Sequence, residues 1–144
     1  MFNQSPDDRL SSWSQFRKDL ETSEDPLSEV AVFWKDAPFV PLTRQVDPFN
    51  PYSWPTPWEI IMHNKYDDFT RALMMAKTLQ LTNRFKRAQI EIKTVIDLEK
   101  NLYFNLVFVD NMLVLNYTDG SVVKVEELPG SFRYENLIVV DSPR

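Results

Sequence analysis

The hydrophobic positions of the chain follow a helical period in its first half and a strand period in its second half. Leu10, Trp13, Phe16 and Leu20 recur at helical spacing with charged residues between them, which predicts an amphipathic helix of about four turns. From residue 88 onward, apolar and polar residues alternate as they do in half-buried strands. We therefore expect helices first and strands afterwards.

Several helix starts are marked by a polar residue followed by proline. Ser5-Pro6 opens the first helix. Asp25-Pro26 opens a segment whose period fits either a short helix or a buried strand, and the Asp-Pro opening favours the helix. The residues from Thr56 to Glu59 have the pattern of a capping box, which predicts a short helix after them.

A central buried helix is expected next. Asn64 is predicted to cap it, with Asp67 and Asp68 in a first turn where the helix dipole favours acidic side chains. Residues 66–79 carry one apolar stripe, which is typical of a helix that packs against a sheet.

The pattern as a whole predicts an α+β fold, with N-terminal helices and a central buried helix packed on an antiparallel meander of about five strands. Residues 1–22 are expected to form an N-terminal amphipathic helix or arm, and residues 23–144 a single α+β domain. The N-terminal helix either packs on its own domain, which is favoured, or docks on a partner as an arm. The expected strands lie at 88–98, 102–109, 112–117, 121–126 and 133–140.

A proline-rich connection at residues 38–55 separates the first helices from the central one. Its prolines exclude a helix or a central strand, yet it is too apolar for a free linker. We expect an extended chain packed over the core, because so many aromatic side chains need burial. The alternative is a ligand for a groove on another protein.

Composition and charge narrow the function classes. The net charge is −5, and residues 1–63 hold 10 acidic against 5 basic residues, so the whole acidic excess lies there. This balance makes nucleic acid an unlikely partner. There is no cysteine, no signal sequence and no membrane-spanning run, so a soluble protein, cytoplasmic or virion-associated, is expected.

Candidate chemistry is sparse. A small hydrolase would use His63 with Asp67 or Asp68, and a weak nucleic-acid site would use the basic residues of Arg84-Phe85-Lys86-Arg87. Glu59 with the two aspartates would form a carboxylate cluster, but solvated first-turn acids explain them better. No glycine-rich phosphate loop is present, and no metal, cofactor or small-molecule substrate is expected.

The segments YDDFTRALMMAKTLQL, RAQIEIKTVIDL and LYFNLVFVDNMLVLNY together resemble the transglutaminase-like (papain-like) core. In that family a Cys opens the central helix, a His lies on the next-but-one strand, and an Asp ends the strand after a hairpin. The corresponding positions fall near Lys65–Asp67, near Leu102–Phe104 and at Asn116. The resemblance therefore implies a degenerate core that lacks the catalytic Cys and His, and a chain that is not an enzyme.

A second resemblance links the stretch DPFNPYSWPTPWEII to small accessory or virion proteins of large tailed phages. The function predicted from the sequence is a non-enzymatic protein–protein interaction or assembly module. Deletion of residues 1–22 is expected to leave a folded domain and to remove partner binding. The predicted partner-binding side chains are apolar or aromatic: Leu10, Trp13, Phe16, Leu20, Phe49, Tyr52, Trp54 and Trp58.

Overall fold

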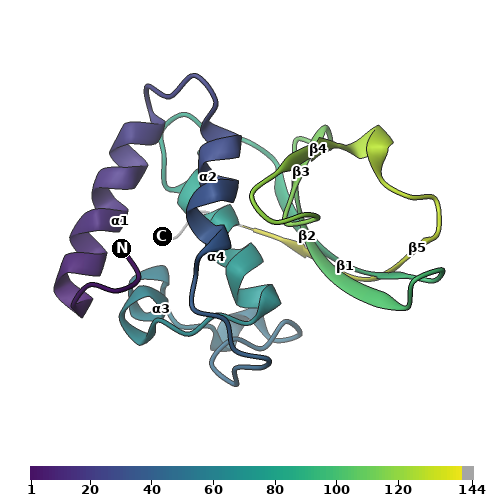
Figure 1. Cartoon of the computed structure of the whole chain (residues 1–144), viewed down its shortest axis with the longest axis horizontal. Helices are drawn as coiled ribbons and strands as arrows, with labels where there is room; N and C mark the ends of the chain where they lie inside the picture. The colour runs from purple at the N-terminus through teal and green to yellow at the C-terminus, as the bar shows by residue number, and fades with distance from the viewer. Residues whose placement is uncertain (141–144) are drawn as a thin grey trace.

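The structure is a computed structural model that describes residues 1–140, with helices gathered on one side and a sheet on the other (Figure 1). The sheet order is β4-β3-β2-β1-β5, and every pairing is antiparallel. The predicted α+β class is confirmed. The elements are α1 (Pro6–Leu20), α2 (Pro26–Lys35), η1 (Pro51–Ser53), α3 (Pro57–His63), α4 (Asp68–Gln80), β1 (Ile90–Asp97), β2 (Leu102–Val109), β3 (Leu113–Leu115), β4 (Val122–Lys124), η2 (Val125–Glu127) and β5 (Phe132–Val139).

The helix starts are formed as their sequences predict. Asp25 accepts a hydrogen bond from the Ser28 N–H, so the segment with two possible readings is a helix. Thr56 and Glu59 form both hydrogen bonds of the capping box, which lower the pKa of the Glu59 carboxyl.

The start of α4 differs from the prediction. Asn64 does not cap α4; it ends α3 in the left-handed conformation, with φ 58°. Asp67 is the residue that caps α4, because its carboxylate accepts the Thr70 N–H. The predicted cap therefore lies three residues too early, since asparagine suits both a helix start and a left-handed helix end.

The strands form a meander from β1 to β4, and β5 then returns to pair with the free edge of β1. Asp110 and Asn111 both have positive φ angles, as expected for a tight hairpin turn between β2 and β3. The third and fourth strands are shorter than predicted. Asn116 takes a φ of 69° and ends β3, and Val125 begins the short helix η2.

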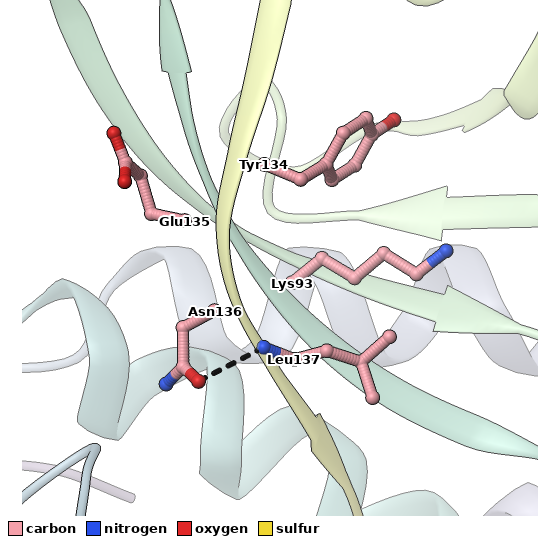
Figure 2. A pocket seen from close by; sticks show the side chains of 5 residues that line it. All are labelled: Lys93, Tyr134, Glu135, Asn136 and Leu137. Carbon is pink, nitrogen blue, oxygen red and sulfur yellow. Dashed lines mark hydrogen bonds between the residues drawn. The ribbon is translucent and has the colours of Figure 1, made fainter.

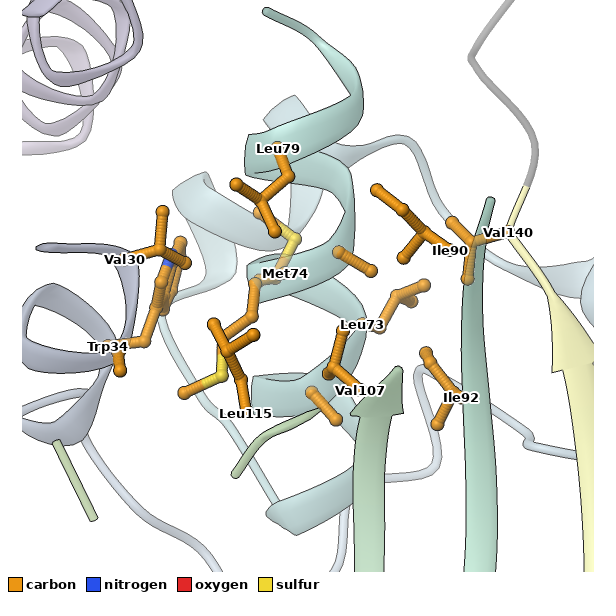
Figure 3. Close-up of a cluster of buried hydrophobic side chains, with 14 of the residues drawn as sticks. Val30, Trp34, Leu73, Met74, Leu79, Ile90, Ile92, Val107, Leu115 and Val140 are labelled. Atoms are coloured by element: carbon orange, nitrogen blue, oxygen red, sulfur yellow. The ribbon is translucent and has the colours of Figure 1, made fainter. Parts of the chain in front are cut away.

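The main hydrophobic core lies between α4 and the inner face of the sheet (Figure 3). Leu73 and Leu79 of α4 are buried with Ile92 of β1 and Val107 of β2. On its other side α4 packs against α2, so it is enclosed by helix and sheet. This confirms the predicted central buried helix.

Helix α1 belongs to the same core, so the boundary after residue 22 does not separate an arm from a domain. Trp13 and Leu20 are fully buried in the cluster that also contains α4 and the sheet. The Nε1 groups of Trp13 and Trp34 both donate to the Thr78 hydroxyl, at 3.0 and 3.2 Å. Threonine 78 thereby joins α1, α2 and α4.

The proline-rich connection packs on the core only in part. Val46 is buried, and the Trp54 ring lies 5.7 Å from the Phe69 ring. In contrast, Leu42, Phe49 and Tyr52 are 77%, 78% and 101% exposed. The connection bends through a turn at residues 48–49 and through the short helix η1, so it does not lie flat on the core and these side chains face solvent. In the described part of the chain, no helix has the length and apolar character needed to cross a membrane.

Candidate functional site

Polar side chains from α4, β2 and the end of β3 meet at the N-terminus of α4. The Asp68 carboxylate accepts hydrogen bonds from the Asn105 backbone N–H at 3.2 Å and from its side-chain amide at 2.9 Å. It also accepts from the Asn116 amide at 3.3 Å and lies 3.4 Å from an Arg71 nitrogen. Asp68 therefore fixes the start of the helix to two neighbouring strands.

The neighbours of Asp68 are themselves held in place. The Asn116 amide also donates to the Asn105 carbonyl at 2.9 Å, and the Thr94 hydroxyl donates to the Asn105 side-chain oxygen at 2.7 Å. Arg71 forms a second ion pair with Asp119 at 3.1 Å. We call Asp68, Arg71, Asn105, Asn116 and Asp119 the polar cluster.

A groove of about 260 Å³ opens beside this cluster, and we call it the α4 groove. Its polar floor contains Asp68, Thr94 and Asn105. Leu42 and Phe49 of the proline-rich connection line it together with Tyr103 of β2, which is 64% exposed. Exposed apolar walls over a floor of fixed hydrogen-bonding groups are suited to binding a ligand that is partly apolar and partly amide-like.

The predicted partner-binding residues are divided by the structure. Trp13 and Leu20 are in the core, so they offer no surface to a partner, and Leu10, Phe16 and Trp54 are partly buried. An amphipathic pattern predicts which helix face is apolar but not what covers it. Phe49, Tyr52 and Trp58 are exposed, and of these only Phe49 lines the α4 groove.

His63 is not assembled with the aspartates. It is exposed at the end of α3. The Asp67 carboxylate is taken up by the Thr70 N–H, the Thr70 hydroxyl and the Thr43 N–H. The proposed hydrolase pair therefore does not form among the described residues.

The basic segment 84–87 has a structural use. The Arg84 guanidinium donates to the carbonyls of Leu20 and Ser23, and Glu21 accepts the Arg84 N–H. Arg84 thus ties the end of α1 to the turn after α4, and the other two cations of the predicted nucleic-acid site, Lys86 and Arg87, are exposed. Weak nucleic-acid binding through them stays a prediction.

A second hollow, of about 360 Å³, lies on the outer face of the sheet next to β5 (Figure 2). Tyr134, Lys93 and Leu137 lie on one side of the β5 ribbon, and Glu135 and Asn136 lie on the other. The Lys93 ammonium sits 4.2 Å from the Phe108 ring and 5.7 Å from the Tyr134 ring. The Lys93 ammonium is already stabilised by these two aromatic rings, so we do not treat this hollow as a ligand-binding site.

The structure also locates the positions at which the family resemblance places catalytic residues. At the first position, Tyr66 is buried between Phe2 and Trp34, and burial raises the pKa of its hydroxyl above the ordinary value of 10.0. At the third position, Asn116 joins the polar cluster. The residue of β2 that faces Asp68 is Asn105, one position beyond the predicted range Leu102–Phe104.

Sequence reasoning missed the importance of Asn105, Arg71 and Asp119. One signal was available for Asn116, which interrupts an otherwise apolar strand, and the alternation of β2 could have indicated which of its residues face α4. Nothing in the sequence joins Arg71 to Asp119, because they meet only when β3 packs beside the start of α4.

Comparisons with known proteins give structural relatives only. No protein-family model and no curated protein matches the sequence. Among solved structures, calcium-bound Legionella pneumophila LapG has a TM-score of 0.67 and 17% identity over 92% of this chain and 75% of its own. A second LapG structure, with no stated ligand, has a TM-score of 0.65 and 18% identity over 93% of this chain and 79% of its own. EGTA-treated LapG has a TM-score of 0.66 and 18% identity over 95% of this chain and 82% of its own.

LapG is a cysteine protease of the transglutaminase-like (papain-like) fold, so the predicted fold resemblance is supported. The prediction that the chain is not an enzyme is wrong as drawn from this fold, because its structural neighbours are proteases. Absence of cysteine excludes a thiolate nucleophile, but it does not exclude catalysis by other side chains.

One of the similar LapG structures is calcium-bound, but the start of α4 in this chain does not fit a comparable ion. Calcium takes about six to eight oxygen ligands. Here the Asp67 and Asp68 oxygens already accept hydrogen bonds from N–H and hydroxyl groups. Within residues 1–140, no three His, Cys, Asp or Glu side chains gather where they could hold a metal.

Proposed function

We propose that this chain, which has the fold of LapG, binds an extended polypeptide segment of a protein partner in the α4 groove. The observation that carries the proposal is the position of exposed Leu42, Phe49 and Tyr103 around a floor that contains Asp68 and Asn105. The proposal retains the predicted protein–protein interaction and assigns it to the α4 groove.

The chemistry of the groove suits a peptide. Apolar side chains of a bound segment would cover the walls and remove exposed hydrocarbon from water, which is the main favourable contribution to binding. The Thr94 hydroxyl lines the groove and donates its proton to the Asn105 side chain, so it can accept a hydrogen bond from a peptide N–H. The Asp68 oxygens already accept hydrogen bonds within the protein and therefore hold the floor in place. A rigid floor also limits the entropy lost on binding.

Two further facts support the location. The groove lies at the head of the central helix, where the family resemblance places the reacting groups. The structural neighbours are proteases, and proteases act on polypeptides. The resemblance to phage virion or accessory proteins stays a prediction, and co-purification of the chain with a larger assembly would measure it.

The test is a peptide selected from a random display library on the whole chain, followed by measurement of its Kd for single variants. Phe49→Ala should weaken binding by about tenfold, as expected for an aromatic anchor. Tyr52→Ala is the matched control, since Tyr52 lies in the same connection and is fully exposed but does not line the groove. Equal effects of the two variants, or no effect of either, would contradict the proposal.

A further inference from the structure

The outward face of α2 forms a second surface that the α4 groove does not use. The buried residues of α2 include Leu27, Val30 and Trp34. Ser28, Glu29, Val32, Phe33 and Asp36 recur at spacings of three and four along the opposite, outward stripe. Val32 on this stripe is 48% exposed. An apolar side chain on the outer stripe of a helix exposes hydrocarbon to water, and a partner could bury it.

Two hollows follow this stripe and share residues. The first, of about 430 Å³, lies between α1 and α2 and is lined by Phe16, Asp25, Ser28, Glu29, Val32 and Phe33. The second, of about 640 Å³, is lined by Val32, Phe33 and Asp36 together with the segment before α1. Val32 and Phe33 line both, so the two hollows adjoin along α2, and we call the pair the α2 groove.

The floor of the α2 groove is aromatic and well supported. The Phe16 and Phe33 rings stack with centroids 4.0 Å apart, so α1 and α2 are in direct contact here. The Phe33 ring also packs edge-on against Trp34 at 5.3 Å, and Trp34 is fully buried. Because the stacked rings are fixed by their contact with buried Trp34, they form an apolar surface that does not need to reorganise when a partner binds.

The rim of the α2 groove is acidic. Asp25 and Asp36 cap the two ends of α2, and Glu29 lies in its first turn. All three line the hollows, and no Lys or Arg of the described chain lines either hollow. Residues 1–63, which contain the groove, also hold the whole acidic excess of the protein. A partner segment that enters this groove therefore meets apolar floor and negative rim together.

We infer that the α2 groove binds a basic amphipathic helix of a partner protein. Its apolar stripe would lie over Phe16, Val32 and Phe33, and its Lys or Arg side chains would reach the acidic rim. A third helix in a groove between two helices is a common recognition geometry. Complementary charge selects the basic sequence over an acidic one and speeds association. This surface shares no lining residue with the α4 groove.

The test uses the whole chain and two fluorescent peptides of about 12 residues, a length that spans about 18 Å as a helix. One peptide carries leucine on one face and lysine on the other, and the second has glutamate in place of every lysine. Fluorescence anisotropy should show binding of the lysine peptide, weakened by added salt. No binding of the lysine peptide, or equal binding of both peptides, overturns the inference.

Matched variants locate the surface. Val32→Ser removes one apolar contact and should raise the Kd of the lysine peptide by about fivefold. Glu29→Gln removes one rim charge and should raise this Kd by about threefold. Val139→Ser and Glu24→Gln are the controls. Val139 is an exposed valine on β5, and Glu24 is an exposed acid that lines neither hollow. Unchanged binding for the controls supports the α2 groove, and equal losses in test and control variants contradict it.

Discussion

Asp68 is the residue on which the geometry of the candidate site depends, because its carboxylate joins α4 to β2 and to the end of β3. It accepts from the backbone and side chain of Asn105 and from the Asn116 amide. Removing it leaves these donors without their acceptor in a partly buried place. Asp119 differs from it, since Asp119 is 69% exposed and pairs only with Arg71 among the contacts of the polar cluster.

We predict that Asp68→Ala lowers the free energy of unfolding by about 1–3 kcal/mol, the cost of unsatisfied donors. Asp119→Ala removes a surface ion pair and should cost less than about 1 kcal/mol. Urea unfolding monitored by fluorescence gives both values. Equal losses would mean that Asp68 acts only as another surface charge.

Tyr66 gives a prediction about pH. Burial raises the pKa of its hydroxyl above 10.0, so the folded protein keeps the neutral form where the unfolded chain already ionises. The stability that this provides is fully present below pH 10 and is lost as the pH rises above it. The loss approaches about 1.4 kcal/mol per pH unit until the folded-state pKa is reached.

The Tyr66→Phe variant isolates this effect, because it removes the titrating hydroxyl and keeps the ring. The difference in unfolding free energy between wild type and variant should be constant from pH 7 to 9 and should change above pH 10 in favour of the variant. A constant difference across the whole range would show that Tyr66 ionises alike in both states.

At the scale of elements, α1, α2 and α4 share one hydroxyl group within their common hydrophobic core. Thr78 on α4 accepts the indole N–H groups of Trp13 and Trp34 and donates to the Met74 carbonyl at 2.6 Å. All three helices therefore share a polar contact inside an apolar core, where lost hydrogen bonds are most costly. Deletion of residues 1–22 should accordingly unfold the domain, contrary to the expectation from the sequence.

Thr78→Val tests this junction because it keeps the side-chain shape and removes both acceptor contacts. We predict a loss of about 2–4 kcal/mol in unfolding free energy, since two buried N–H groups lose their partner. In a Trp13→Phe background the same change should cost less, because one of the two donors is already absent. Additive losses in this double-mutant cycle would contradict a shared junction.

At the scale of the whole molecule, the two proposed binding surfaces lie on different elements. The α4 groove is formed by residues 41–49 of the proline-rich connection, the start of α4 and the sheet. The α2 groove is formed by α1, α2, the segment before α1 and Pro38 at the start of the connection. The same chain therefore has room for two partner segments at once.

We predict that saturation with the leucine–lysine peptide leaves the Kd of the library-selected peptide unchanged to within about twofold. Competition titrations measure this directly. Mutual displacement would mean that both peptides use one surface, and the Phe49→Ala and Val32→Ser variants would then identify which surface it is.

The sequence by itself determined the elements and the fold class. Proline, aspartate and threonine at helix starts, a capping box and strand alternation act over a few neighbouring residues, so they can be recognised without tertiary information. Ambiguity remained where one residue type suits two local roles, as Asn64 does.

Only the tertiary structure decided which apolar residues are surface and which are core. The sequence predicts a partner-binding role for both Trp13 and Phe49, yet Trp13 is fully buried and Phe49 is 78% exposed. It also decided the candidate site, because Asp68 and Asn105 are 37 residues apart and meet only when α4 packs on β2. Burial and long-range contacts depend on the packing of whole elements, and local sequence patterns do not contain that information.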